Sequence, residues 1–243
     1  MSFVFLNVYG KTILEATANQ EGISGEGSTL NENTQEHWDR VYTTREVESL
    51  GWYEESPETC LGLVTRSGID KGEPILDVGV GASCLVDALV KGEYTDIIGV
   101  DISSVALDKL RARIGDDMEG NVRLIVDDVT RPTHMLDIGP VSLWHDRAVL
   151  HFLLEDSQVQ AYFDTLRGMV RDGGYVIIAT FNLEGARQCS GLDIRNYDHG
   201  MIADLLGEDF TMLDHFDHLY HTPGGAERPY VYTLSRRKGA SGR

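Results

Sequence analysis

Short apolar runs alternate with amphipathic segments along most of the chain. The runs at 74–78, 96–100, 122–126, 141–144 and 175–181 consist largely of Val, Ile and Leu. A run that is apolar at almost every position is typical of a strand buried on both of its faces. The pattern therefore predicts five central strands.

The segments between these runs show helical periodicity. It is clearest at 158–171, where Val159, Tyr162, Phe163, Leu166 and Met169 recur at intervals of three and four. Gly173-Gly174 is expected to stop that helix. Further helices are predicted at 34–45 with Thr34 as N-cap, at 56–68 with Ser56 as N-cap and Pro57 as first residue, and at 83–90, 103–114 and 199–206.

Strands that alternate with helices indicate an α/β protein with a mostly parallel sheet covered on both faces. Two further strands, at about 210–220 and 229–236, flank the turn signal Thr222-Pro223-Gly224-Gly225 and should form a terminal hairpin. Residues 1–34 are interpreted as an N-terminal extension, in which 20–34 form a linker without periodicity. The main domain is expected to cover 35–237, and 238–243 to be a flexible tail.

Composition and charge narrow the range of functions. The chain has 243 residues and a formal net charge of −18. This acidity argues against nucleic acid as a partner, because nucleic-acid-binding proteins usually present a basic face. No apolar stretch reaches the 18 residues of a membrane span, and no signal peptide is apparent. Three isolated cysteines indicate free thiols, so the cytoplasm is the expected location, without a metal site.

Acidic side chains follow three successive strands. Asp77 precedes the glycine turn Gly79-Val80-Gly81, Asp101 ends the second strand, and Asp127-Asp128 follow the third. Ligands of open α/β sheets bind outside the carboxyl ends of the strands, where these residues would meet. Glycines let the backbone approach a ligand, and a carboxylate can accept hydrogen bonds from ribose hydroxyls. Each aspartate alone could be a helix cap, but three in this pattern favour a ligand site.

This pattern resembles the class I, Rossmann-like methyltransferases that use S-adenosyl-L-methionine and release S-adenosyl-L-homocysteine, and the resemblance covers about 35–237. It implies a three-layer fold whose seven-stranded, mostly parallel sheet has the order 3-2-1-4-5-7-6, with strand 7 antiparallel. It also implies a set of cofactor-binding positions: Asp77, Gly79 and Gly81 at the methionine, Asp101 and Ile102 at the ribose, and Asp128 and Val129 at the adenine.

The main alternative is an NAD-type dehydrogenase. That class expects a third glycine in the turn, where this chain has Cys84, and a second βαβαβ half, which is missing. The methyltransferase interpretation is therefore preferred.

The reacting end of the site is expected after the fourth strand. Asp146-Arg147-Ala148 resembles the Asp-Arg-Gly-Ala run of thiopurine methyltransferase-like enzymes, which implies an active-site position for Arg147, although Ala148 replaces the glycine. His145 is the preferred general base because an unperturbed histidine titrates near pH 6.5. A structural hydrogen bond at a strand end is an equal alternative for His145.

The N-terminal helix is expected to cover the cofactor. Trp38-Asp39-Arg40-Val41-Tyr42, followed by Trp52, resembles the W-D-x-x-Y opening of small-molecule and some protein-lysine methyltransferases. Aromatic rings there would exclude water and face a sulfonium, and Tyr42 is a second candidate catalytic residue. The alternative is a helix that only packs Trp38 and Tyr42 into the core.

Three hypotheses about the acceptor stay open. A small-molecule acceptor is preferred, a protein lysine is the second possibility, and a non-catalytic module that only binds the cofactor is the third. The loop after the fifth strand, with Cys189-Ser190-Gly191-Leu192, and the segment from His218 to Pro223 are both candidates for the substrate opening. Methyl transfer from a sulfonium is an in-line displacement that needs alignment and no metal.

Overall fold

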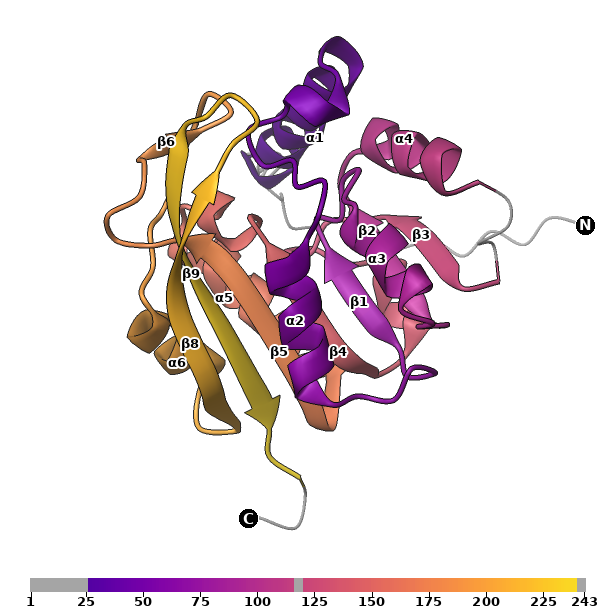
Figure 1. Cartoon of the computed structure of the whole chain (residues 1–243). Coiled ribbons are helices and arrows are strands. Elements are labelled where there is room, and N and C mark those ends of the chain that lie inside the picture. Colours follow the sequence, from indigo (N-terminus) through magenta and orange to yellow (C-terminus); the bar gives the residue numbers. More distant parts are fainter. Residues whose placement is uncertain (1–25, 116–119, 240–243) are drawn as a thin grey trace, which may run out of the picture.

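A computed structural model of the protein describes residues 26–115 and 120–239. Its main sheet has seven strands in the order β3-β2-β1-β4-β5-β9-β8 (Figure 1). The strands are β1 (Ile75–Val78), β2 (Ile97–Asp101), β3 (Val122–Val126), β4 (Val141–Arg147), β5 (Val170–Phe181), β8 (Phe210–His221) and β9 (Glu227–Arg237). Only β9 runs antiparallel to its neighbours, β5 and β8. When β8 and β9 are counted as the sixth and seventh strands of this sheet, the order is the predicted 3-2-1-4-5-7-6. The predicted terminal hairpin is confirmed as β8 and β9.

Helices cover both faces of this sheet, which makes three layers. On one face lie α2 (Glu58–Ser67), α3 (Leu85–Lys91) and α4 (Ser104–Ile114), and on the other α5 (Asp156–Met169) and α6 (His199–Leu206). Alternate strand residues face opposite layers, as in β1, where Ile75 packs with the α2 layer and Leu76 with the α5 layer. Short 3₁₀ turns are η1 (Val47–Ser49), η3 (Met135–Ile138) and η4 (Leu150–Phe152).

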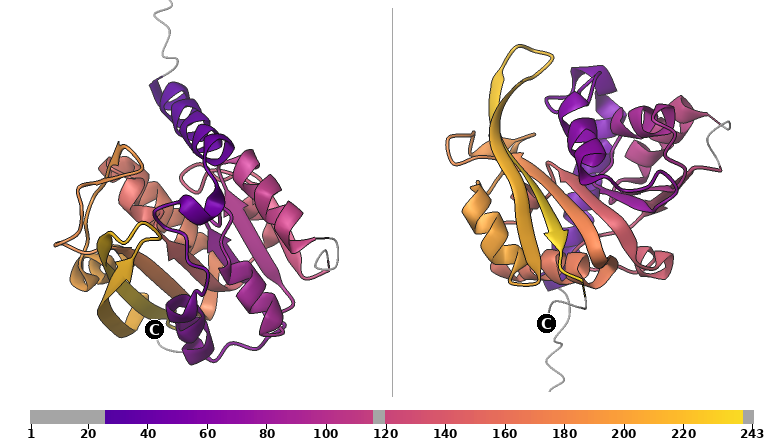
Figure 2. Two further views of the ribbon diagram at one scale, coloured as in Figure 1. Left: turned by 45° about the horizontal axis from the view of Figure 1, so that its top comes forward. Right: turned by 60° about the horizontal axis from the view of Figure 1, so that its bottom comes forward.

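The N-terminal helix α1 begins earlier than expected. It spans Glu26–Thr44. The predicted linker is therefore wrong for residues 26–34, and Thr34 lies inside the helix instead of capping it. Glycine costs a helix only about 1 kcal/mol per residue, so Gly27 does not by itself prevent one. The short helix suggested near residues 12–16 lies outside the described residues. Figure 2 shows α1 across one end of the sheet and the β8–β9 hairpin along its edge.

Three predicted boundaries also need correction. Strand β4 extends to Arg147, so His145 and Arg147 lie in the strand and not after it, because the pairing with β1 and β5 continues. Helix α5 ends at Met169, where Val170 turns to extended backbone and pairs with Val141, four residues before Gly173-Gly174. Helix α2 begins at Glu58, with Pro57 as its N-cap.

The loop after β5 contains a small hairpin that the sequence pattern did not predict. Strands β6 (Gln188–Cys189) and β7 (Leu192–Asp193) pair antiparallel. Ser190 and Gly191 join them with positive φ angles of 54° and 81°. Two left-handed residues in a two-residue loop are the signature of a type I′ turn, whose twist matches that of the strands. This hairpin places Cys189 near the carboxyl end of the sheet.

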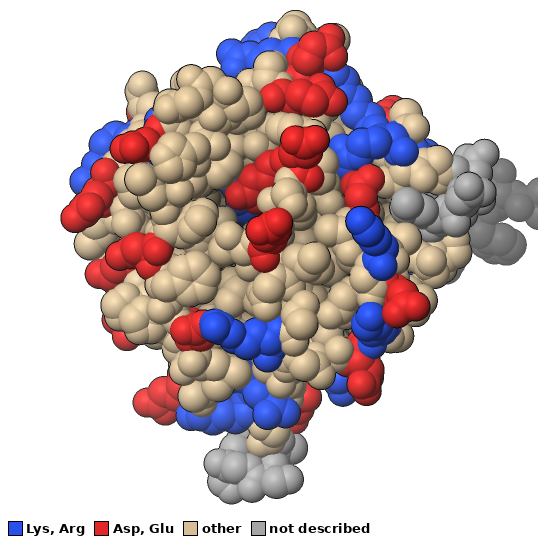
Figure 3. All heavy atoms as spheres, in the orientation of Figure 1, with Lys and Arg blue, Asp and Glu red and all other residues tan. Residues whose placement is uncertain are grey.

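The surface mixes charges of both signs. Figure 3 shows Asp and Glu side chains interspersed with Lys and Arg over the face in view. Some form exposed pairs, such as Arg113 with Asp87 at 2.7 Å, and pairs of this kind contribute little to stability. In the parts of the chain that the structure describes, no helix has the length and apolar character that crossing a membrane would require.

A buried hydrogen-bond network fixes the end of β4. The Trp144 indole N–H donates to the Tyr162 hydroxyl at 3.1 Å, and that hydroxyl donates to Asp146 Oδ2 at 2.7 Å. Asp146 also accepts the backbone N–H groups of Val149 at 2.8 Å and Leu150 at 3.1 Å. All three side chains are fully buried. The network therefore anchors the turn η4 on helix α5.

Removal of one hydroxyl from this network should destabilise the fold. Tyr162→Phe leaves the Trp144 N–H and Asp146 short of a partner in a buried site, so we expect the free energy of unfolding to fall by about 1–3 kcal/mol. Urea denaturation measures this change. Tyr175→Phe is the control, because the Tyr175 ring is half-buried and contacts the Arg236 guanidinium. Equal stability of Tyr162→Phe and the wild type would contradict the role given to the network.

Candidate active site

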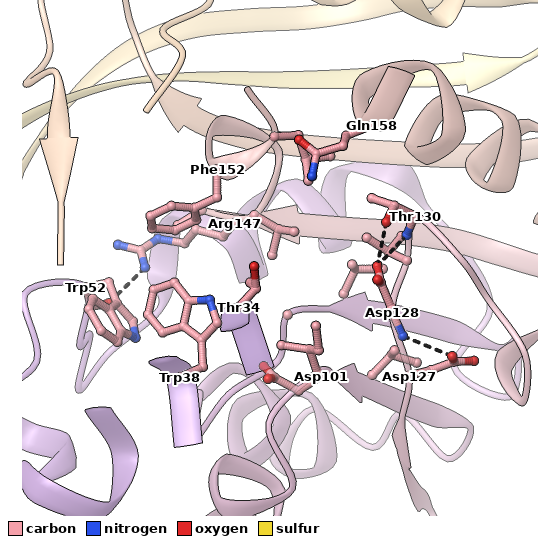
Figure 4. A pocket seen from close by; sticks show the side chains of 18 of the residues that line it. Thr34, Trp38, Trp52, Asp101, Asp127, Asp128, Thr130, Arg147, Phe152 and Gln158 are labelled. Atoms are coloured by element: carbon pink, nitrogen blue, oxygen red, sulfur yellow. Dashed lines mark hydrogen bonds between the residues drawn. The ribbon is translucent and has the colours of Figure 1, made fainter. Parts of the chain in front are cut away.

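An open cavity of about 1020 Å³ lies at the carboxyl ends of the parallel strands. Its walls come from the ends of β1 to β4, from α1 and from the loop after β5. Figure 4 shows Asp127, Asp128 and Thr130 at one end, Asp101 between, and Arg147, Phe152 and Trp52 at the other end. Of the predicted aspartates, Asp101, Asp127 and Asp128 meet in this cavity, whereas Asp77 lies in a neighbouring cavity.

Two aspartates shape the end of the cavity beside β3. Asp127 accepts backbone N–H groups from Thr133 and Met135, both at about 2.8–3.1 Å. Burial raises the pKa of Asp127, but these N–H groups outweigh it and hold the pKa below the ordinary value. Asp128 Oδ1 accepts the backbone N–H of Thr130 at 2.8 Å and its hydroxyl at 2.7 Å. These bonds fix the loop so that Asp128 and Val129 line the cavity.

Asp101 lies at the centre of the wall. Its Oδ2 accepts the N–H of Gly81 at 2.8 Å, and its Oδ1 accepts the N–H of Ser103 at 2.8 Å. Burial raises the pKa of Asp101 to about 6, and the nearby carboxylates of Asp77 and Asp39 act in the same direction. Each oxygen keeps a lone pair, which can accept a ribose hydroxyl. Ile102 lines the cavity next to it.

The first βα turn needs its glycines. Gly79 and Gly81 have φ angles of 62° and 53°, which L side chains rarely adopt. A Cβ on Gly79 would lie 2.0 Å from a Val149 methyl group, and one on Gly81 would lie 2.3 Å from the Tyr42 hydroxyl. Gly79 lines the cavity, whereas Gly81 is covered by Tyr42 and holds Asp101.

Aromatic side chains from α1 and the following segment cover the cavity. Trp38 makes edge contacts with Trp52 and Phe152, with ring centroids 5.6 and 5.0 Å apart. Asp39 docks the helix by accepting the Ser103 hydroxyl at 2.6 Å. Tyr42 is buried beside Asp101, and burial raises its pKa above the ordinary value. Tyr42 therefore stays protonated; its hydroxyl lies beside Gly81 and Asp101, and its ring packs against Trp52 with ring centroids 6.3 Å apart.

Arg147 joins three segments at the other end of the cavity. It donates to the Trp52 carbonyl at 2.9 Å and forms an ion pair with Glu54 at 3.0 Å. Its guanidinium faces the Tyr220 and Tyr230 rings at 4.9 and 5.4 Å. Cys189 also lines this end. The flagged segments around Cys189 and Tyr220 thus reach the site, as the sequence led us to expect.

His145 lies elsewhere than expected. Its side chain is 2% exposed and points below the glycine turn toward α2, where Nδ1 lies 2.7 Å from Asp77 Oδ1. Both residues line a second cavity of about 560 Å³ that shares Gly79, Tyr42, Trp52 and Arg147 with the main one. His145 does not line the main cavity. A role for His145 as the base that meets the acceptor therefore finds no support in its position.

Several lining residues were missed from the sequence. Glu54, Tyr230 and Gln158 have no motif of their own and reach the site only through the fold. The alternation of Tyr230 and Tyr232 in β9 was the one available signal, since it puts both rings on one face of the sheet. Ala148 has a positive φ of 77° at the cavity wall, the position where the resemblance expects glycine.

Comparisons with known proteins agree with this site. A family model described as methyltransferase domain matches residues 75–174. EEF1A lysine methyltransferase 2 of Danio rerio is 24% identical over 160 residues, covering 61% of this chain and 69% of that protein. The Mus musculus protein of the same name is 34% identical over 113 residues, covering 42% of this chain but only 46% of that protein.

The fold is shared with solved methyltransferases. The structure of Burkholderia thailandensis 1,6-didemethyltoxoflavin-N1-methyltransferase, with bound 1,6-didemethyltoxoflavin and S-adenosylhomocysteine, aligns with a TM-score of 0.62 at 16% identity. The alignment covers 87% of this chain and 88% of that one. Residues 75–174 thus match a methyltransferase domain, and the chain has the three-layer fold of these methyltransferases. We expect S-adenosylmethionine to be the methyl donor, as the sequence pattern predicts.

The residues present fit this cofactor. Asp101 offers two carboxylate oxygens for ribose hydroxyls, the glycine turn leaves room for close approach, and Val129 and Leu153 give apolar walls for a base. Asp77 keeps a buried oxygen, Oδ2, without a hydrogen-bond partner, which suits the cofactor's ammonium group. When bound, the cofactor supplies an activated methyl group on a sulfonium. The protein's part is to orient it and to exclude water.

Cofactor affinity should depend on ionised Asp101. Protonation removes an acceptor for the ribose, so the affinity should fall as the pH drops through about 6, by up to tenfold per pH unit. Asp101→Ala should weaken binding by about 10- to 100-fold, from about 1.5–3 kcal/mol of lost hydrogen bonding. Calorimetric titration with S-adenosylhomocysteine measures both. Wild-type affinity in a folded Asp101→Ala variant would contradict the assignment.

Proposed function

We propose that this methyltransferase acts on a small-molecule acceptor that binds at the Arg147 end of the main cavity. The observation that carries the proposal is the enclosure of that end by segments far apart in the sequence. Trp38 and Trp52 close it from the N-terminal side, Cys189 from the loop after β5, and Tyr220 from the terminal hairpin. The Tyr220 hydroxyl donates to the Tyr53 carbonyl and so joins the terminal hairpin to the N-terminal cover.

This enclosure limits the size of the acceptor. A small molecule fits within this aromatic end of the cavity, whereas a loop of a folded protein would have to displace the Tyr53–Tyr220 contact. The Tyr220 and Tyr230 rings face the Arg147 guanidinium, and Trp52 and Phe152 line the same end of the cavity. In-line transfer needs the acceptor atom held close to the methyl carbon, and such positioning contributes about 7–11 kcal/mol in favourable cases.

The transfer itself is a simple displacement. The acceptor atom forms a bond to the methyl carbon while the carbon–sulfur bond breaks, and the electron pair of that bond stays on sulfur in the product. A proton carried by the acceptor passes to solvent. Arg147 favours an acceptor whose attacking atom or neighbouring group is negative, because a guanidinium stabilises an adjacent anion.

A protein lysine is the second candidate. The curated relatives named above are EEF1A lysine methyltransferases, and the opening at Trp38 resembles the W-D-x-x-Y pattern of some protein-lysine methyltransferases. Glu54 beside Trp52 could attract an ammonium group. Glu54 is already paired with Arg147 at 3.0 Å, however, so a lysine would have to compete with a fixed cation.

A labelled methyl donor distinguishes these candidates. The enzyme is incubated with a cell lysate and, separately, with small thiols, carboxylic acids, amines and purified elongation factor 1A. We expect the label in low-mass products, and Arg147→Met should lower turnover by about 10- to 100-fold, the equivalent of a charged hydrogen bond. Calorimetry with S-adenosylhomocysteine shows whether that variant still binds cofactor. Label confined to the protein fraction would overturn the small-molecule proposal in favour of a protein acceptor.

A further inference from the structure

Asp77 and His145 form a buried pair under the glycine turn. The two residues are register partners in the neighbouring strands β1 and β4, so their side chains leave the same face of the sheet. His145 Nδ1 lies 2.7 Å from Asp77 Oδ1, and each residue is 2% exposed. The pair lines the second cavity, which shares Trp52 and Arg147 with the main cavity.

Each member of the pair keeps one poorly satisfied polar atom. Asp77 Oδ2 and His145 Nε2 are both buried and make no hydrogen bond to an oxygen or nitrogen atom in the described part of the chain, and the Cys60 thiol faces the imidazole. Such atoms are costly, because their desolvation is not repaid by a strong hydrogen bond. Both residues line the cavity of about 560 Å³ that adjoins Gly79. The resemblance places the amino-acid end of the cofactor at this glycine turn.

We propose that Asp77 and His145 form a proton-exchange pair: when the cofactor's ammonium group reaches Asp77, His145 releases a proton to solvent. The Nε2–H bond of the imidazolium breaks, while the Nδ1–H bond and its hydrogen bond to Asp77 Oδ1 remain. The ammonium then replaces the lost positive charge beside the carboxylate. His145 is thus a positioning residue, which holds the Asp77 carboxylate in its orientation in the free enzyme.

Charged neighbours support this exchange. The groups that face His145 are Asp77 from β1, Cys60 from α2, Asp146 and Arg147 from its own strand, and Glu54 from the cover. Burial lowers the pKa of His145, but Asp77 and then Cys60 outweigh it and hold the pKa well above 6.5 in the free enzyme. The cofactor's ammonium group would be a second cation at the Asp77 carboxylate, and it would lower the pKa of His145 again.

The sign of the pH dependence follows from this exchange. The free enzyme carries the proton and the complex does not, so the affinity rises with pH between the two pKa values, by up to about tenfold per pH unit. The upper edge of this window is the free-enzyme pKa of His145, which lies above the ordinary histidine value. Near that edge the effect is distinct from the loss of affinity below about pH 6 that Asp101 causes.

Calorimetry in buffers of different ionisation enthalpy tests the proposal. S-adenosylhomocysteine is titrated into the full chain at about pH 7.5 in phosphate and in Tris, and we expect the release of up to about one proton per molecule bound. His145→Gln should abolish the release. His151→Gln is the matched control: His151 is also fully buried, and burial lowers its pKa to about 3, so it has no proton to lose. The His151→Gln variant should release as many protons per molecule bound as the wild type.

A second measurement covers the case in which His145→Gln does not fold. Histidine side-chain NMR of the labelled wild type, with and without S-adenosylhomocysteine, should show one buried imidazole that changes from protonated to neutral on binding. No proton release by the wild type, equal release by His145→Gln, or an unchanged imidazole would overturn the proposal. This proposal rests on S-adenosylmethionine as the cofactor. Neither measurement uses a methyl acceptor, so failure of this proposal is distinguishable from failure of the proposed small-molecule acceptor.

Discussion

The hydrogen bond from the Gly81 N–H to Asp101 is the contact on which the site depends. It ties the turn after β1 to the end of β2, and the same carboxylate accepts the N–H of Ser103 at the start of α4. The turn can approach Asp101 only because Gly81 has no side chain where the Tyr42 hydroxyl lies. The position of α4 and the docking of α1 through Asp39 both follow from this arrangement, as does the proposed ribose contact.

The opposite wall of the cavity is held from the other layer of the fold. Helix α5 contributes Tyr162, which joins Trp144 to Asp146, and Asp146 fixes the backbone of η4. Burial raises the pKa of Asp146 to about 6, and its hydrogen bonds oppose that rise. The cofactor site is therefore rigid on both sides, while the acceptor end is formed by covers that meet at Arg147. A site built in this way can bind the same cofactor while the residues of its covers are adapted to a different acceptor.

Much of this architecture could be predicted from local patterns. The buried strands are almost continuously apolar, and Asp101, Asp127 and Asp128 follow them directly, so strand order and strand ends bring them together. Other features depend on tertiary packing. Helix α1 extends through Gly27 against propensity, and β4 continues through His145 because its polar side chain finds Asp77 on the neighbouring strand. The aromatic rings around Arg147 meet only when the hairpin folds back.

We propose that S-adenosylmethionine lies across the carboxyl ends of β1, β2 and β3 with its sulfonium toward Arg147. A crystal structure of the chain with S-adenosylhomocysteine tests this placement directly. We predict the adenine beside Asp128 and Val129, the ribose hydroxyls on Asp101, and the sulfur between Gly79 and the Arg147 end of the cavity. A nucleoside bound in the reverse direction, or away from Asp101, would contradict the account.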